Sequence, residues 1–320
     1  MGTFIKTEAA ALPIAGDRTA QDVFYGNGFF HRCMAVLSGA LLLVAIACIA
    51  FFDYRLPFSQ AASLAGFAPF AGALAYCWWA KRYRLLQACS LPFWASVLST
   101  LLKFPLYIAA RSHVALKDDA LARIDGMLRV EVPPILHFMA PHPWARAVLA
   151  LSYDMLFPLM VAAAILPALR FRFSAAKELI VATSFATLAG APLFALVPAI
   201  GPWIVYGYPP LPLQAQTQAL FLSLRAGGIH RIDLNEPGFV CFPSFHVLLA
   251  ILSAVALCSI KPLRVPAILL AALIAASTLT TGWHYFTDVM AGLALAFLSV
   301  VASKAFSRWE RTRLNRPSRP

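Results

Sequence analysis

Charged side chains are scarce in this chain of 320 residues. Asp, Glu, Lys and Arg together make up 12% of the sequence, about half of the share that soluble globular domains carry. Hydrophobic residues reach 61%, and the mean hydropathy is +0.74. This composition excludes a disordered chain, a coiled coil and a soluble multidomain enzyme.

The sequence also lacks cysteine pairs with the spacing of a metal site or a redox motif. None of the six cysteines belongs to a CxxC pair and most lie inside apolar runs, so we expect them to be packing residues: Cys33, Cys48, Cys77, Cys89, Cys241 and Cys258. The first thirty residues contain no short apolar core followed by a small-residue cleavage site. We therefore expect the first membrane-spanning helix to act as its own anchor.

Apolar runs of 18 or more residues recur along most of the chain. A transmembrane helix needs about 20 such residues to cross the hydrocarbon core of a bilayer. The sequence therefore predicts an all-α, polytopic membrane protein with about eight transmembrane helices. The predicted spans are 34–52, 58–80, 86–109, 146–169, 178–199, 243–260, 265–282 and 284–303.

The basic residues indicate how these spans are oriented. With the N-terminus in the cytoplasm, the cytoplasmic segments hold 17 of the 26 Lys and Arg residues, in agreement with the positive-inside rule. Both termini are then cytoplasmic, and we expect a bacterial inner membrane. Because the basic residues are spread over many loops, the net charge of +12 does not indicate nucleic-acid binding.

Two histidines and one carboxylate mark the strongest candidate for a chemical site. His246 lies in FPSFH, at the start of the span 243–260, and His284 and Asp288 lie in GWHYFTDV, at the start of the span 284–303. Both spans begin on the predicted non-cytoplasmic side, so the two histidines lie at a similar depth. A spacing of four residues puts His284 and Asp288 on one helical face, where the carboxylate can orient the imidazole.

Pro243 and Ser244 suit the first turn of a helix, whose free backbone N–H groups attract an anion. From this pattern alone three interpretations are open. The residues form a phosphoryl-transfer site, or the histidines are structural and satisfied by neighbours, or two histidines and one carboxylate hold a metal ion.

The same residues resemble a known family. PSFH resembles the PSGH motif of the type 2 phosphatidic acid phosphatase (PAP2) superfamily, and the stretch from Ser277 to Asp288 is similar to its SR-x5-H-x3-D motif. HYFTDV also resembles a segment of sphingomyelin synthases. LVPAIGPW, the long outer loop and FPSFH most resemble the branch that contains inositol phosphorylceramide synthases. The resemblance covers about residues 115–300.

This resemblance implies a role for each residue. His284 attacks phosphorus and forms a phosphohistidine, Asp288 orients and stabilises its imidazole, and His246 protonates the leaving oxygen and then acts as a base. Ser244 and the backbone of Phe245 hold phosphate oxygens. No metal and no other cofactor is required. The substrate is a lipid phosphate or phospholipid in the bilayer, and the acceptor is water for a phosphatase or an alcohol for a phosphotransferase.

The sequence departs from the family pattern where cations are expected. Thr278 stands in place of the Arg of the third motif, and no K-x6-RP motif precedes PSFH. Phe245 replaces the family's Gly, and we expect it to narrow the pocket entrance. Our first candidate for a replacement cation is Arg225, and the second is Arg231. Lys103 and Arg111 form a more remote third choice.

The predicted organisation has four parts. Residues 1–33 form a cytoplasmic N-terminal segment, 34–110 three accessory transmembrane helices, 111–303 a PAP2-like catalytic membrane domain and 304–320 a basic cytoplasmic tail. Asp154 lies inside the span 146–169 and needs a partner or a polar cavity; a role in the acceptor site and a structural pair are both open. The rival functions are a transporter and a non-catalytic binder of lipid phosphate.

Overall fold

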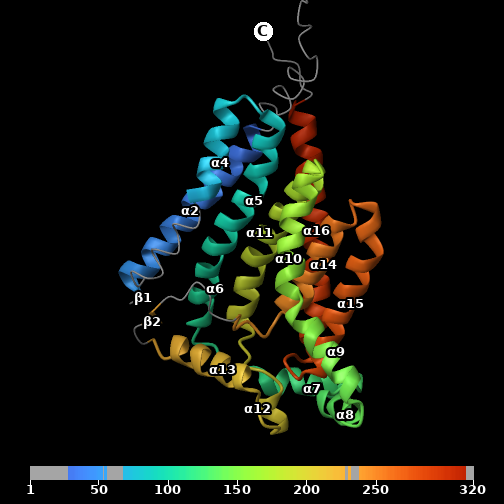
Figure 1. Cartoon of the computed structure of the whole chain (residues 1–320). Coiled ribbons are helices and arrows are strands. Elements are labelled where there is room, and N and C mark those ends of the chain that lie inside the picture. The colour runs from blue at the N-terminus through green and yellow to red at the C-terminus, as the bar shows by residue number, and fades with distance from the viewer. Residues whose placement is uncertain (1–27, 53, 56–67, 228–229, 232–237, 315–320) are drawn as a thin grey trace, which may run out of the picture.

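The protein is almost entirely helical in the part of the chain that the computed structural model describes, which comprises residues 28–52, 54–55, 68–227, 230–231 and 238–314. Within these ranges the β-structure consists of β1 (Tyr54–Arg55) and β2 (His230–Arg231), which pair in parallel. The predicted all-α class is confirmed. The helices run roughly side by side and form one elongated bundle (Figure 1).

Five helical segments are long and apolar enough to cross a membrane. They are α2 (Gly28–Phe51), α5 (Tyr83–Leu101) with α6 (Lys103–Ala110), α11 (Phe173–Leu196), α15 (Arg264–Thr280) with the short helix η2 before it (Lys261–Leu263), and α16 (Phe286–Leu314). A sixth span results if α9 (Pro143–Asp154) and α10 (Leu156–Leu169), which meet at a bend of 43°, are counted together. The protein is therefore polytopic, with five or six candidate spans in its described residues.

The predicted number of eight spans is not confirmed. Helix α14 (Phe245–Leu257) has 13 residues and is shorter than a membrane-spanning helix. Of the predicted span 58–80, the structure describes α4 (Ala68–Trp79), and residues 58–67 lie outside the described residues.

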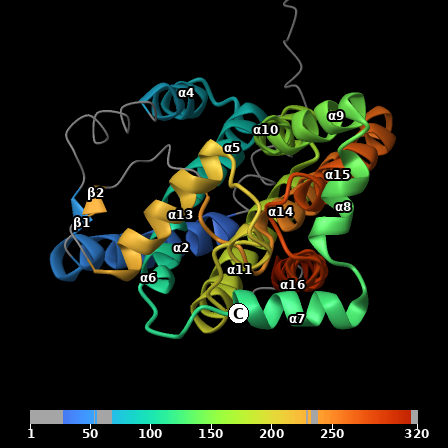
Figure 2. The same ribbon diagram turned by 90° about the horizontal axis from the view of Figure 1, so that it is seen from below.

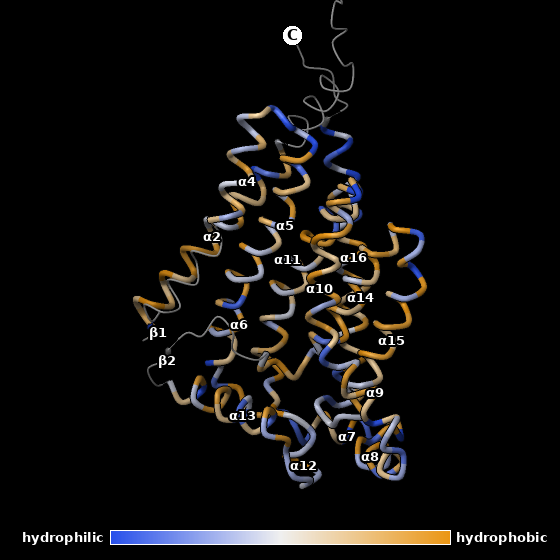
Figure 3. The backbone as a smooth tube through the Cα atoms, in the orientation of Figure 1, coloured by the Kyte–Doolittle hydropathy of each residue, from blue (hydrophilic) through white to orange (hydrophobic). Residues whose placement is uncertain are grey.

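Large apolar side chains on the outside of the bundle agree with a lipid environment. Val36 is 74% exposed, Phe157 73% and Phe297 68%, and a soluble monomer rarely exposes many such residues together. Hydrophobic stretches occupy the middle of the bundle, whereas hydrophilic stretches gather toward its ends (Figure 3).

The centre of the bundle is formed by α11, α14 and α16. Their contact is built from small and aliphatic side chains: Ala182, Ala186, Leu248, Leu252, Leu295 and Ala296. Small residues let membrane helices approach closely, so dispersion contacts replace the hydrophobic driving force that is absent in lipid. At one end of the bundle Lys177 of α11 and Glu310 of α16 form a buried ion pair.

Short helices cover the opposite end, where α14 and α16 begin (Figure 1). These are α7 (Asp118–Leu128), α8 (Val132–Met139), α12 (Trp203–Tyr206) and α13 (Pro212–Arg225). Viewed onto this end, α7 lies next to the start of α16, and α13 crosses beside α6 and α11 (Figure 2). The polar side chains of the candidate site lie at this end of the bundle.

Candidate active site

The FPSFH segment forms the start of α14. Ser244 is the N-cap: it is fully buried, and its Oγ accepts a hydrogen bond of 3.5 Å from the N–H of Val247. An N-cap serine satisfies one of the free amides in the first turn of a helix. This leaves the backbone N–H groups of Phe245 and His246 at the helix start, where the dipole favours an anion.

The ring of Phe245 packs against α11. A Cβ atom on Gly190 of α11 would lie 2.9 Å from the Cζ atom of Phe245. The ring therefore packs against the bare backbone of α11 and fills the space between two central helices. A glycine on the neighbouring helix makes room for the ring in this position.

His284 lies in a loop just before α16, although the sequence predicted a helix from residue 284. Gly282 ends the preceding turn in the left-handed region, with φ of +71°, and its carbonyl accepts a hydrogen bond of 2.8 Å from the hydroxyl of Tyr208. Glycine adopts this conformation without the steric cost that a side chain brings. The turn delays the start of α16 to Phe286.

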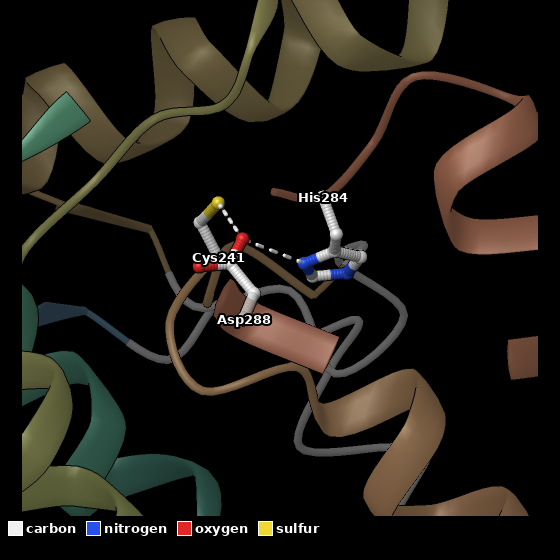
Figure 4. Close-up of side chains that lie close together, drawn as sticks. All are labelled: Cys241, His284 and Asp288. Carbon is white, nitrogen blue, oxygen red and sulfur yellow. Dashed lines mark hydrogen bonds and ion pairs between the residues drawn. The ribbon is translucent and has the colours of Figure 1, made fainter. Parts of the chain in front are cut away.

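The expected pairing of His284 with Asp288 is nevertheless present. Nδ1 of His284 lies 3.4 Å from Oδ2 of Asp288. The same carboxylate oxygen accepts hydrogen bonds from the backbone N–H of Tyr285 at 2.9 Å and from the thiol of Cys241 at 3.1 Å. Figure 4 shows the carboxylate of Asp288 between the thiol and the imidazole. His284 is 3% exposed and Asp288 is fully buried, so water competes little for these contacts.

The two histidines lie side by side at the bundle end. The ring centroids of His246 and His284 are 5.9 Å apart. His246 also stacks on Tyr153 of α9 with a centroid distance of 4.1 Å, and the Tyr153 hydroxyl lies 3.4 Å from Nδ1 of His246. Each imidazole therefore has a protein partner at Nδ1, and Nε2 is the ring nitrogen left for a substrate.

Cys241 and Tyr153 belong to the site but were missed from the sequence. Burial raises the pKa of the Cys241 thiol, and the carboxylates of Asp288 and Asp118 raise it further. The thiol therefore stays protonated and donates to Asp288.

Tyr153 lies inside an apolar run next to Asp154, and this polar pair was the one signal that could have identified Tyr153 from the sequence. Asp154 itself is exposed at the bend between α9 and α10.

The cluster also has the composition of a metal site. One ligand atom each from Cys241, His284 and Asp288 lie within 4.8 Å of one another, and all three residues are buried. Oδ1 of Asp288 is buried without a hydrogen-bond partner among the described residues. Sulfur, nitrogen and carboxylate oxygen are ligands that zinc accepts. The sequence had suggested two histidines and one carboxylate as metal ligands. In the structure the residues that could hold a metal ion are Cys241, His284 and Asp288.

Arg225, the first candidate for a replacement cation, is not brought to the histidines. Gln214, near the start of α13, donates a hydrogen bond of 3.1 Å to the carbonyl of Gly282, close to His284. Arg225 is the last residue of α13, about 16 Å further along the helix axis. Its Nη2 donates to the carbonyl of Val114 at 2.7 Å, so it fastens α13 to the chain that follows α6.

Of the other candidate cations, Arg111 and Lys103 lie in the described part of the chain with their side chains. Arg231 lies in β2, and its side chain is outside the described part. Arg111 donates hydrogen bonds to the carbonyls of Phe52 at 2.7 Å and Gly227 at 3.2 Å. Lys103 is the first residue of α6. Arg111 therefore fastens α6 to the chain that follows α2 and to the chain that follows α13.

The geometry thus joins a helix start, two adjacent imidazoles and a carboxylate that orients one of them. Among curated proteins and among solved structures, none matches the chain. A family model described as the PAP2 superfamily matches residues 119–302. This range contains α7 from its second residue, α8 to α15, all of these site residues and the first half of α16. Because this match covers more than half of the sequence, the chain belongs to the PAP2 superfamily.

Proposed function

We propose that this protein transfers a phosphoryl group from a lipid phosphate ester through a phosphohistidine on His284. The observation that carries this proposal is the pair of adjacent imidazoles, 5.9 Å apart, of which one has Asp288 at its Nδ1. Membership of the PAP2 superfamily supports phosphatase- or phosphotransferase-type chemistry on lipid phosphates.

In the first step the Nε2 lone pair of His284 attacks phosphorus, and the bond from phosphorus to the lipid oxygen breaks. His246 in its doubly protonated form donates its Nε2 proton to that leaving oxygen and becomes neutral, and the carboxylate of Asp288 balances the positive charge on the phosphorylated imidazole. In the second step His246 accepts a proton from the acceptor O–H. The acceptor oxygen then bonds to phosphorus, and the phosphorus–nitrogen bond breaks to regenerate His284.

The start of α14 supplies the phosphate-binding groups in this scheme. The N–H groups of Phe245 and His246 face the anion, whereas the N–H of Ser244 is already bonded to the carbonyl of Asp288 at 3.0 Å. The helix dipole adds about half a positive charge at this position. Arg231 remains our candidate for an additional cation.

The acceptor decides between two reactions. Water as acceptor gives a phosphatase, whereas an alcohol such as inositol or another polar head group gives a phosphotransferase. The resemblance of the motifs to the inositol phosphorylceramide synthase branch favours a transferase. We propose that residues 111–303 carry this chemistry, with residues 34–110 as accessory helices. In the proposed topology the site faces the periplasm of a bacterial inner membrane.

The decisive experiment is phosphate release from short-chain phosphatidic acid by the purified protein in detergent with EDTA. We expect release by the wild type and none by His284→Ala. His137→Ala, which changes an exposed histidine on α8, is the matched control. Turnover that persists in His284→Ala would contradict the phosphohistidine, and wild-type turnover that EDTA abolishes would favour a metal at Cys241, His284 and Asp288.

A second arm addresses the transferase. The wild type is incubated with phosphatidylinositol and an alcohol acceptor, and new phosphoesters are identified by mass spectrometry. A product that requires both the acceptor and His284 would assign the alcohol reaction. Binding of phosphatidic acid without turnover in either arm would instead support the rival lipid-phosphate binder.

A further inference from the structure

Two buried aspartates on α7 have no role in the chemistry described above. Asp125 is fully buried and Asp118 is 4% exposed. They are seven residues apart and therefore lie on one face of the helix, two turns from each other. Neither forms an ion pair with a Lys or Arg in the described part of the chain. Buried carboxylates without a counter-charge are costly unless hydrogen bonds compensate them, so their contacts are informative.

Asp125 accepts its hydrogen bonds from the first turn of α16. The backbone N–H of Phe286 donates to Oδ2 at 2.7 Å, and the backbone N–H and hydroxyl of Thr287 donate to Oδ1 at 2.8 Å and 2.5 Å. The first N–H groups of a helix have no partner within the helix. A carboxylate from a separate helix satisfies them here, and so α7 fixes the start of the helix that carries Asp288.

Asp118 accepts its hydrogen bonds from the loop after α11 and from Tyr285. The backbone N–H groups of Ile200 and Gly201 donate to its carboxylate at 2.9 to 3.1 Å, and the hydroxyl of Tyr285 donates to Oδ1 at 3.1 Å. Burial raises the pKa of Asp118, and these three sets of hydrogen bonds oppose the rise.

The two carboxylates thus form hydrogen bonds with the three residues that come immediately after His284. Tyr285 is bound by Asp118, and Phe286 and Thr287 are bound by Asp125. The next residue is Asp288, which also accepts the N–H of Tyr285. A shift of α7 would therefore displace the His284 loop and the carboxylate that orients its ring together.

We propose that Asp118 and Asp125 are positioning residues, which hold the segment 284–288 so that Nε2 of His284 points at the phosphorus atom. This inference rests on the proposed function, because it assumes that His284 is the nucleophile. It adds two residues and the helix α7 to the machinery of the reaction, although neither carboxylate touches the substrate.

The test uses orthovanadate, which mimics a phosphoryl group in transfer, on the full-length protein in detergent. The readout is the vanadate concentration that gives half of the maximal rise in melting temperature, so no substrate is needed. For Asp125→Asn we expect this concentration to increase at least about tenfold, with turnover of short-chain phosphatidic acid lower by about 10²-fold. An amide cannot accept from both Phe286 and Thr287 through its two terminal atoms.

The matched control is Asp119→Asn, which makes the same change at an exposed neighbour on α7 and should behave like the wild type. Tyr285→Phe is a milder variant that removes one bond to Asp118 and keeps the ring; we expect a smaller increase of the same kind. It keeps the test decisive if Asp125→Asn does not fold.

A merely structural role predicts a lower melting temperature with wild-type vanadate affinity in both variants, and this result would overturn the proposal. His284→Ala separates the two hypotheses. Vanadate stabilisation that persists in His284→Ala contradicts the proposed function itself. Stabilisation lost in His284→Ala but unchanged in Asp125→Asn and Tyr285→Phe contradicts the positioning role alone.

Discussion

The backbone N–H of Ser244 donates a hydrogen bond of 3.0 Å to the carbonyl oxygen of Asp288. This bond joins the start of α14 to the first turn of α16, and thus ties the two histidine-bearing segments through the main chain. One turn further along α16, Gly292 lies so close that a Cβ atom would be 2.6 Å from the carbonyl oxygen of Ser244. The distance between His246 and His284 is set by this backbone contact.

Gly292→Ala should therefore push the start of α14 away from α16 and so disturb the site. The added methyl group meets backbone, which cannot move aside as a side chain can, and overpacking of this kind costs about 1–3 kcal/mol. We expect a lower melting temperature and reduced turnover. Gly39→Ala on α2, where nothing lies within 4 Å of an added Cβ, is the control. Equal melting temperatures for the two variants would show that α14 and α16 are free to separate.

Asp288→Asn tests whether a carboxylate is needed beside His284. The amide cannot balance the positive charge on a phosphorylated imidazole, and its NH2 group would face donors from Tyr285 and Cys241. We expect turnover to fall by about 10²- to 10⁴-fold, with the protein still folded. Steady-state rates with short-chain phosphatidic acid measure this, with Asp119→Asn as the exposed carboxylate control. A loss below tenfold would remove Asp288 from the mechanism.

Tyr153→Phe removes the hydroxyl next to Nδ1 of His246 and keeps the stacked ring. Without this partner the doubly protonated imidazole loses a hydrogen-bond acceptor at Nδ1, so the form of His246 that can donate a proton from Nε2 is less populated. We expect a three- to tenfold loss of turnover, about the effect of one hydrogen bond, and little change in KM. Tyr76→Phe on α4, an exposed position, is the matched control. A changed KM with unchanged turnover would place Tyr153 in substrate binding instead.

The Cys241 thiol should resist alkylation in mildly alkaline solution. Its pKa is raised by burial and by two carboxylates, so the reactive thiolate stays rare as the pH rises through about 8 to 9. We expect N-ethylmaleimide to label Cys258, half-buried at the end of α14, much faster than Cys241. Peptide mass spectrometry at a series of pH values measures both. Similar rates at the two cysteines would mean that the thiol is charged or accessible.

Much of this architecture could be predicted from the sequence, because hydropathy predicts the apolar helices and two short motifs identify His246 and His284. His284 and Asp288 are four residues apart, so their pairing could be predicted from local spacing. The pairing is present even though α16 begins only at Phe286. The position of Arg225 depends on how α13 packs against α6, and no local pattern contains that information. Tyr153 was missed for a similar reason: its partner His246 is 93 residues away.

The shortness of α14 sets the depth at which the proposed chemistry takes place. Thirteen residues extend about 20 Å, whereas the hydrocarbon core is about 30 Å thick. With the Leu257 end at one boundary of this core, the His246 end lies about 10 Å short of the other. A lipid phosphate lies outside this core. In the proposed reaction both the lipid phosphate and the water or alcohol acceptor must therefore move inward by this distance to reach the histidines.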